Sequence, residues 1–184
     1  HWRPPSAMKA LQSTWPQVRV VRFRRNAGQT AAFDAGFRAA RGAIFITLDG
    51  DLQNDPADIP KVLAGLSEAD CVNGWRLKRQ DSWLRRISSR IANGLRNRLT
   101  HESIRDVGCS LRAFRRECVA RIKFYNGLHR FLPTLIRMEG FRIAEVPVNH
   151  FPRPAGRSKY GVWNRAVRAL RDLFAVRWMM ARQL

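Results

Sequence analysis

The sequence predicts an α/β domain, with a mostly parallel, Rossmann-like sheet flanked by helices and followed by an amphipathic C-terminal helix. Three observations favour this class. Strand-like and helix-like segments alternate between residues 18 and 48 in the order of a βαβ unit. The apolar run at 43–48 is continuous, as in a strand that is covered on both faces. Two later strand-like segments, 107–114 and 141–148, are separated by a helical pattern.

Turn residues define the first strand–helix–strand unit. VRVVRF at 18–23 has the β-branched and aromatic composition of a strand. The following NAGQT stretch opens an alanine-rich helix that runs to about Arg41 and ends at Gly42. The run 43–48 is the second strand, so we expect a right-handed crossover.

The rest of the chain continues the alternation of helices and strands, and residues 1–16 offer at most a short helix. The predicted elements are a short helix from Pro56 to about Leu66, a strand at 70–74, an arginine-rich helix at 83–99, a strand at 107–114, a helix at about 128–139, a strand at 141–148, a Pro/Gly/Arg-rich loop at 149–160 and a helix from Gly161 onward. We therefore expect one domain over residues 1–160 and an amphipathic, membrane-interfacial helix over 161–184.

Composition favours a globular protein with a polyanionic partner. The 184 residues are 45% hydrophobic, and the formal net charge is +20. Nucleic acid, a phosphorylated substrate or an anionic membrane surface would suit that charge, and a solvated basic surface is the alternative. The cysteines Cys71, Cys109 and Cys118 have no zinc-ligand spacing and are interpreted as reduced, partly buried thiols. No apolar run is long enough to span a bilayer.

The stretch IFITLDGDLQNDPADIP at 44–60 concentrates acidic residues in a basic chain. Asp49 and Asp51 follow the predicted strand directly, where α/β sheets bind ligands. Two carboxylates at this spacing can share a divalent cation, and Gln53 adds a neutral oxygen, which suits Mg²⁺ or Mn²⁺. Asp55 and Asp58 flank Pro56 and are explained by helix capping and the helix dipole.

Several motifs in sequence order carry a resemblance to a known family. They are DGDLQNDPADIP at 49–60, GWR at 74–76, DVGC at 106–109, HRFLP at 129–133 and GRSKYG at 156–161. Over about residues 18–178 the chain resembles the family 2 glycosyltransferases of the dolichyl-phosphate mannose synthase type, especially the bacterial members that glycosylate undecaprenyl phosphate. The resemblance implies a GT-A fold and a cytoplasmic-face enzyme. It also implies inverting transfer of a sugar from a nucleotide diphosphate donor to a polyprenyl phosphate.

The resemblance further implies roles for individual residues. It places the Mg²⁺ or Mn²⁺ on Asp49, Asp51 and Gln53, and it places Asp106 and Arg76 at the reacting centre. The side chains implied to hold the donor and acceptor phosphates are Arg76, Arg85, Ser89, Arg130, Arg153 and Lys159. The residues that match a stretch near the nucleotide are Asn26, Gly28 and Gln29.

Each of these assignments has a structural alternative. The alternatives are a solvated helix face for Arg85, a salt bridge from Asp106 to Arg105 or Arg112, exposed helix-start positions for His129 and Arg130, and a plain helix-start turn for Asn26, Gly28 and Gln29. For Arg153 and Lys159, the surrounding glycine and prolines favour a ligand-binding loop.

The C-terminal segment has an apolar face and arginines on its other faces. The apolar face consists of Val162, Trp163, Ala166, Val167, Leu170, Leu173, Phe174 and Trp178, and the arginines are Arg165, Arg168, Arg171 and Arg177. This composition is typical of a helix that lies on anionic lipid, and a core-packing helix with basic outer residues is the alternative.

The sequence departs from the family at its start. Family members begin with a strand and a PxYNE-like loop, then a second strand and a DDGS-like turn, and no counterpart precedes Val18. We therefore expect the first strands of the fold to be missing. A basic nucleic-acid-binding module and an inactive membrane-associated fragment are the competing functions. No nucleic-acid-binding signature supports the first of these, and no nucleic acid is expected as a partner.

Overall fold

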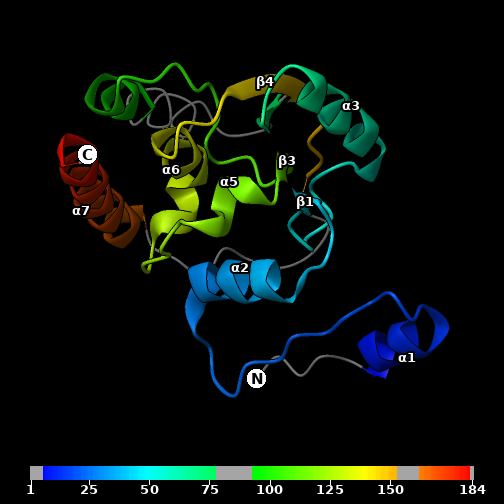
Figure 1. The fold of residues 1–184 in the computed structure, drawn as a ribbon. Helices are drawn as coiled ribbons and strands as arrows, with labels where there is room; N and C mark the ends of the chain where they lie inside the picture. Colours follow the sequence, from blue (N-terminus) through cyan, green and yellow to red (C-terminus); the bar gives the residue numbers. More distant parts are fainter. Residues whose placement is uncertain (1–5, 78–92, 153–161, 183–184) are drawn as a thin grey trace.

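The computed structural model describes residues 6–77, 93–152 and 162–182 (Figure 1). A four-stranded sheet is covered by helices on both faces, and α7 (Val162–Ala181) lies at one end of the molecule. α1 (Ser6–Thr14) lies apart from the sheet, at the end of an extended segment that leads into α2 (Gly28–Ala39). The predicted α/β class is confirmed.

The sheet is mixed and has the strand order β1-β3-β2-β4. Its strands are β1 (Ile44–Thr47), β2 (Cys71–Arg76), β3 (Arg112–Arg115) and β4 (Ile143–Val148). β3 pairs antiparallel with both β1 and β2, whereas β2 and β4 are parallel. β1, β2 and β4 therefore share one direction, and β3 runs against them. A mostly parallel pairing was the wrong expectation, because an apolar run indicates burial on both faces and not the direction of the neighbouring strand.

β1 is an edge strand rather than the central, fully buried strand that its apolar run predicts. Phe45 and Thr47 are buried, but Ile44 and Ile46 are 42% and 39% exposed. The outer edge of β1 has no partner strand among the described residues. The predicted strand at 18–23 is also wrong, since this segment pairs with no strand in the part of the chain that the structure describes. Its Arg19 instead donates a hydrogen bond to the carbonyl of Ala39, at 3.3 Å.

The helices agree closely with the sequence pattern. The remaining helical elements are η1 (Pro56–Asp58), α3 (Ile59–Ala64), η2 (Gly65–Ser67), α5 (Glu117–Ala120), η3 (Leu128–Phe131), α6 (Leu132–Met138) and the helical residues 93–100. α2 ends slightly before the predicted Gly42, because Ala40 already has extended backbone angles. β3 starts at Arg112 rather than at Val107, because a turn precedes it in which the backbone N–H of Gly108 donates to Asp106 Oδ1.

The core is built on both faces of the sheet. On one face, Phe37 of α2 stacks on Phe45 of β1 and meets Phe114 of β3 edge-on, with both ring centroids at 5.5 Å. On the other face, Val62 and Leu66 from α3 and η2 pack against β2 and β3. Since neighbouring residues of a strand point to opposite faces, each inner strand contributes to both clusters. This packing fixes the sheet and therefore the edge where its strands end.

The three cysteines lie inside this core and form no disulfide. Cys71, Cys109 and Cys118 are at most 1% exposed, which is more burial than the sequence predicts. Burial raises the pKa of Cys71 to about 12 and the pKa of Cys118 to about 11, and it also raises the pKa of Cys109. These thiols are consequently kept protonated and unreactive in the folded chain.

Thiol labelling tests this packing. At pH 8 the folded chain is expected to leave all three cysteines unlabelled by a soluble thiol reagent, and unfolding in guanidinium chloride is expected to release all three. Mass spectrometry before and after unfolding measures the labelling. Rapid modification of any cysteine in the folded chain would contradict the burial described here.

Candidate functional site

The functional side chains gather at one edge of the sheet. Because β1, β2 and β4 run in one direction, their carboxyl ends meet at this edge, and the antiparallel β3 begins there. The register pairs Thr47 with Arg112, Arg112 with Asn73, and Asn73 with Glu145. We call these four residues the polar row. The row crosses the whole sheet just below the loops that follow the strands.

Arg112 is the buried centre of the polar row. Its side chain is almost fully buried, and its guanidinium donates to Asn73 Oδ1 at 2.7 Å and to the carbonyl of Val107. Asn73 also donates to the carbonyl of Asp106, at 3.0 Å. No carboxylate in the described part of the chain forms a salt bridge with Arg112. Burial lowers the pKa of the guanidinium, and the row holds a positive charge beneath the edge of the sheet.

Ser110 fixes the acidic loop that follows β1. Its hydroxyl accepts the backbone N–H of Asp49 at 3.3 Å and the side-chain amide of Asn54 at 2.7 Å. Its backbone carbonyl accepts the hydroxyl of Thr47 at 2.7 Å. One residue therefore joins the end of β1 and both ends of the loop.

The acidic loop has a constrained backbone. Leu52 has a φ of +61°, the left-handed region, and its side chain is 73% exposed. This conformation costs a non-glycine residue about 1–2 kcal/mol. The carboxylate of Asp51 accepts the backbone N–H of Gln53 at 3.3 Å, which closes the turn around Leu52. The bonds at Ser110 and Asp51 thus stabilise a strained turn that presents the acidic side chains.

The donor set of this loop fits Mg²⁺ or Mn²⁺. Asp49, Asp51 and Gln53 offer oxygen atoms, the ligands that hard divalent cations prefer. Asp49 is half-buried and lines a cavity of about 720 Å³, and its Oδ1 lies 3.5 Å from Nε2 of Gln29. Within the described residues, no cluster of three or more Asp, Glu, His or Cys side chains is arranged to hold a metal. A cation here would complete its shell with water and ligand phosphate, which is common for Mg²⁺.

The other two aspartates of the stretch have the predicted structural roles, with one difference. Asp55 caps η1 by accepting the backbone N–H of Ala57 at 2.9 Å. Asp58 is buried and caps no helix through its side chain. It instead accepts the backbone N–H of Asn149 at 2.6 Å.

Residues 149–151 are tied to the acidic loop. The backbone N–H of Phe151 donates to the carbonyl of Gln53 at 2.8 Å, and the Gln53 side chain donates to the carbonyl of Phe151 at 3.3 Å. Asn54 and His150 form an isolated β-bridge. The chain therefore enters the 153–161 segment beside the predicted metal site. Arg153 and Lys159 belong to that segment and lie outside the described residues.

Arg76 and Asp106 form a bidentate ion pair at the end of β2. Arg76 Nε and Nη2 lie 2.6 and 2.8 Å from the two oxygens of Asp106. The side chains are only 15% and 9% exposed. The alternative of a salt bridge from Asp106 to Arg105 or Arg112 is therefore wrong about the partner. A Cβ at Gly108 would lie 2.8 Å from Arg76 Nη2, so glycine leaves the room that the pair needs.

The cavity beside Asp49 brings together some of the predicted residues. Gln29, Asp49 and Arg130 line it, together with Ser110, Arg112, His129 and residues of α7. Asn26 and Gly28 do not line it. The Asn26 side chain accepts the backbone N–H of Gly28 at 2.9 Å, which is the helix-start turn that the sequence left open. Arg85 and Ser89 lie outside the described residues, so their predicted phosphate contacts stay predictions.

Sequence reasoning missed Ser110, Asn73 and Arg112 as site residues. A signal existed for Arg112, because a charged residue inside a predicted apolar strand is unusual. Ser110 and Asn73 gave no comparable signal. Their importance depends on the register of β3, which the sequence pattern does not reveal.

The chain belongs to glycosyl transferase family 2, whose family model matches residues 3–123. Among curated proteins, it is 42% identical over 168 residues to dodecaprenyl-phosphate galacturonate synthase of Rhizobium johnstonii, covering 89% of this chain and 49% of the relative. It is 41% identical over 155 residues to undecaprenyl-phosphate 4-deoxy-4-formamido-L-arabinose transferase of Edwardsiella ictaluri, covering 84% and 48%. The chain thus spans about half the length of these relatives.

A solved structure confirms the fold. Glucosyl-3-phosphoglycerate synthase of Mycobacterium tuberculosis, solved with Mn²⁺ and uridine-diphosphate-glucose, superposes with a TM-score of 0.62 at 19% identity. The match covers 92% of this chain and 58% of that one. The mixed sheet with flanking helices is therefore the GT-A fold that the motifs predicted.

Substitution of Ser110 tests whether its hydrogen bonds position the acidic loop. Ser110→Ala removes two hydrogen bonds that hold the loop, and Mn²⁺ affinity in the presence of uridine diphosphate is expected to fall about tenfold. Isothermal titration calorimetry measures the affinity. Ser67→Ala, an exposed serine remote from the loop, is the matched control and is expected to leave the affinity unchanged. Equal affinities in both variants would contradict the positioning role of Ser110.

Proposed function

We propose that this chain transfers a sugar from a nucleotide diphosphate donor to a polyprenyl phosphate, with inversion at the anomeric carbon. The observation that carries the proposal is the cavity of about 720 Å³ that joins the acidic loop at Asp49 to a wall containing Arg112 and Arg130. Donor and acceptor are both phosphate compounds, and their charges suit this combination of a metal loop and cationic walls. The two curated relatives are named for such transfers to polyprenyl phosphates but differ in the sugar, so the proposal is limited to the class.

Asp49, Asp51 and Gln53 are proposed to hold the Mg²⁺ or Mn²⁺. The bound cation neutralises the charge that develops on the departing nucleotide diphosphate. The Ser110 hydroxyl and the strained turn at Leu52 position the loop for this binding. Gln29 donates a hydrogen bond to Asp49 and so contributes to the same site from the start of α2. The proposed nucleotide contacts of Asn26 and Gly28 extend from this helix start.

The acceptor needs positioning more than it needs a base. A phosphate monoester is already anionic and nucleophilic near neutral pH, so its activation requires no proton abstraction. Arg76 is proposed to hold phosphate at the end of β2, and Asp106 fixes the plane of its guanidinium through the bidentate pair. Asp106 then acts near the reacting centre through Arg76. The further phosphate contacts are proposed for Arg85, Ser89, Arg130, Arg153 and Lys159.

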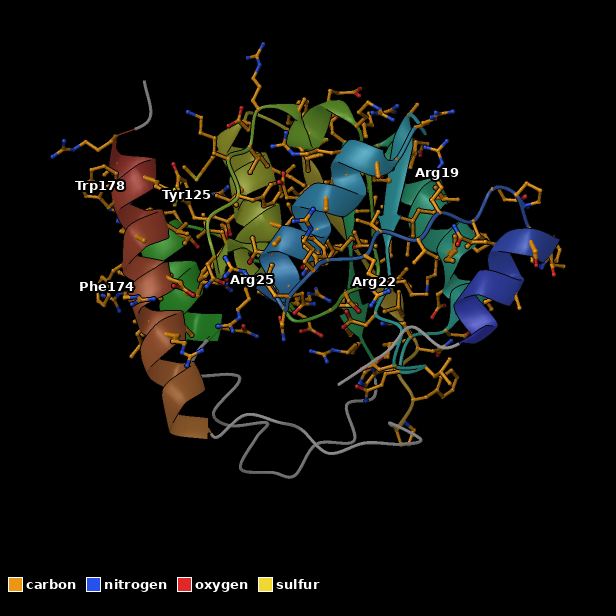
Figure 2. The ribbon with its side chains drawn as sticks, turned by 90° about the horizontal axis from the view of Figure 1, so that it is seen from below. Arg19, Arg22, Arg25, Tyr125, Phe174 and Trp178 are labelled. Atoms are coloured by element: carbon orange, nitrogen blue, oxygen red, sulfur yellow. The ribbon has the colours of Figure 1, made fainter. Side chains whose placement is uncertain are left out.

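The outer face of α7 is proposed to lie on an anionic membrane surface. Phe174 and Trp178 are each 62% exposed and lie four residues apart, which places them on one side of the helix. Leu170, one turn earlier, is 43% exposed and also lines the cavity. Figure 2 shows Phe174 and Trp178 along the outer side of α7. Arg171 is exposed beside this stripe, and the Arg182 guanidinium lies 5.6 Å from the centroid of the Trp178 ring.

The structure divides the apolar face that the sequence predicted for this helix. Leu173 and Val176 are buried against Leu128, Phe131 and Leu135, so they belong to the core rather than to a lipid-facing surface. The side chains of Val162, Trp163, Ala166 and Val167 lie outside the described residues. None of the described helices combines the length and the apolarity that a bilayer crossing requires. The exposed aromatic side chains and arginines of α7 support interfacial binding, which we propose for the cytoplasmic face.

Sugar transfer tests the proposed activity. The purified chain is incubated with undecaprenyl phosphate, a panel of nucleotide diphosphate sugars and Mn²⁺ or Mg²⁺, and the glycolipid product is detected by mass spectrometry. Asp51→Asn is expected to lower kcat/KM about a hundredfold or more, because the charge that develops on the diphosphate loses its stabilisation. Asp55→Asn is the matched control and keeps full activity, since asparagine also caps helices. Absence of product with every donor, or equal activity in both variants, would contradict the proposal.

Vesicle flotation tests the membrane surface. Phe174→Ser combined with Trp178→Ser is expected to weaken binding to phosphatidylglycerol vesicles at least about tenfold, because two exposed aromatic side chains no longer insert. Val21→Ser, at a residue that is 50% exposed and far from α7 in sequence, is the control. Wild-type binding is expected to weaken with salt and on phosphatidylcholine. Equal flotation of the double variant and the wild type would exclude α7 as the docking face.

A further inference from the structure

His129 is held by a relay of hydrogen bonds that joins two distant segments of the chain. The backbone N–H of Gly127 donates to Thr30 Oγ1 at 3.0 Å, and Thr30 Oγ1 lies 2.7 Å from His129 Nδ1. Thr30 is 3% exposed and sits in the first turn of α2, whereas His129 belongs to η3. The imidazole also stacks on Phe33 of α2, with ring centroids 6.2 Å apart. Its position and plane are therefore fixed.

The relay favours one ring nitrogen as the site of the proton. A threonine hydroxyl donates one hydrogen bond and can accept two, and here it accepts the N–H of Gly127. If Nδ1 carried the proton, the buried hydroxyl proton of Thr30 would have no acceptor among the described residues. With Nδ1 as the acceptor this cost is avoided, and the proton of a neutral ring then resides on Nε2.

The surroundings of His129 favour the neutral ring. Burial, followed by the positive charges of Arg130 and Arg112, lowers the pKa of His129 to about 4. The groups packed against it from α2 are the uncharged Phe33 and Thr30. Asp49 lines the same cavity, but it is not among the groups that shift this pKa. At neutral pH the ring is an uncharged hydrogen-bond donor.

His129 lines the cavity of about 720 Å³. Within the described part of the chain, no protein group is hydrogen-bonded to His129 Nε2. This atom is also not among the buried polar atoms that lack a partner. The same cavity is lined by Arg96, which is 5% exposed and whose buried Nε and Nη1 have no hydrogen-bond partner among the described residues. Arg96, Arg112 and Arg130 line the cavity together with Asp49, its only carboxylate among the described lining residues. Such a surplus of donors indicates an oxyanion ligand.

We propose that His129 contacts the substrate directly, and that its neutral Nε2–H donates a hydrogen bond to a phosphate oxygen in this cavity. Thr30 is the positioning residue that keeps the proton on Nε2. The inference rests on the proposed function, which supplies two phosphate sources, the donor diphosphate and the acceptor phosphate. A neutral donor adds a hydrogen bond to a site that already contains arginines, without adding another repelling charge.

Nitrogen NMR of the histidine rings tests the relay and the contact without an activity assay. Two-bond ¹H–¹⁵N correlations of the chain are expected to show His129 as the neutral Nε2–H tautomer. Uridine diphosphate with Mg²⁺, or farnesyl phosphate added alone, is expected to shift its Nε2 signal. The probe that does so identifies the phosphate source. A proton on Nδ1, or an Nε2 signal that neither probe moves, would overturn the proposal.

Variants separate this contact from a purely structural role. His129→Ala is expected to raise KM for one phosphate substrate about 10- to 100-fold, whereas His129→Gln, whose amide N–H can take the place of Nε2–H, recovers most of the loss. Thr30→Val is expected to allow both tautomers in the NMR spectrum, and Thr30→Ser to restore one. Equal KM values for His129→Ala and His129→Gln would overturn the contact.

The same experiments distinguish this inference from the proposed function. If the probes bind and shift backbone signals of the acidic loop while His129 is silent, the contact is excluded and the proposed transfer is unaffected. If the NMR shifts occur but no sugar is transferred to undecaprenyl phosphate, the contact stands as a phosphate site and the proposed transfer fails.

Discussion

The insertion of β3 between β1 and β2 is the constraint on which the site depends. Because β3 runs against its neighbours, the residues that precede it lie at the edge where β1 and β2 end. Ser110 can then bind both ends of the acidic loop, and Asp106 can pair with Arg76. A parallel strand in this place would begin at the opposite edge and could supply neither contact. The topology of one short strand thus brings the acidic loop and the Arg76–Asp106 ion pair together from segments distant in sequence.

Electrostatics explain how a strongly basic chain maintains an acidic loop. The formal net charge is +20, and Arg112 lies buried directly below the loop. A buried guanidinium without a carboxylate partner is costly, and among the described residues the hydrogen bonds of Arg112 go to Asn73 and Val107. Its charge attracts anions to the edge of the sheet. Asp106 balances the charge of Arg76, and the bidentate pair fixes the plane of the guanidinium.

The sequence predicted the elements and the acidic loop better than it predicted their neighbours. α2, β4 and the cap at Asp55 follow from local signals, such as apolar periodicity and a carboxylate placed before a proline. Strand pairing does not depend on local sequence alone. VRVVRF has the composition of a strand, but a strand also needs a neighbouring strand to pair with. Among the described residues, this segment has no such neighbour. The prediction of the ion-pair partner of Asp106 was wrong for the same reason, since Arg76 is 30 residues away along the chain.

The α7 helix shows a similar limit. Periodicity gave its extent and amphipathic character, but it assigned Leu173 and Phe174 to one face. Packing places Leu173 in the core and leaves Phe174 exposed, because the helix lies against η3 and α6 along only part of its apolar surface. When an apolar stripe is wider than one contact face, only the structure shows which of its residues are buried.

The central claim is that a divalent cation at the tip of β1 binds a diphosphate, and electron–nuclear double resonance of Mn²⁺ measures this most directly. With uridine diphosphate present, the wild-type chain is expected to show ³¹P hyperfine coupling to protein-bound Mn²⁺, and Asp49→Asn to lose the bound signal. A phosphorus coupling and Mn²⁺ affinity that are unchanged in Asp49→Asn would contradict the account.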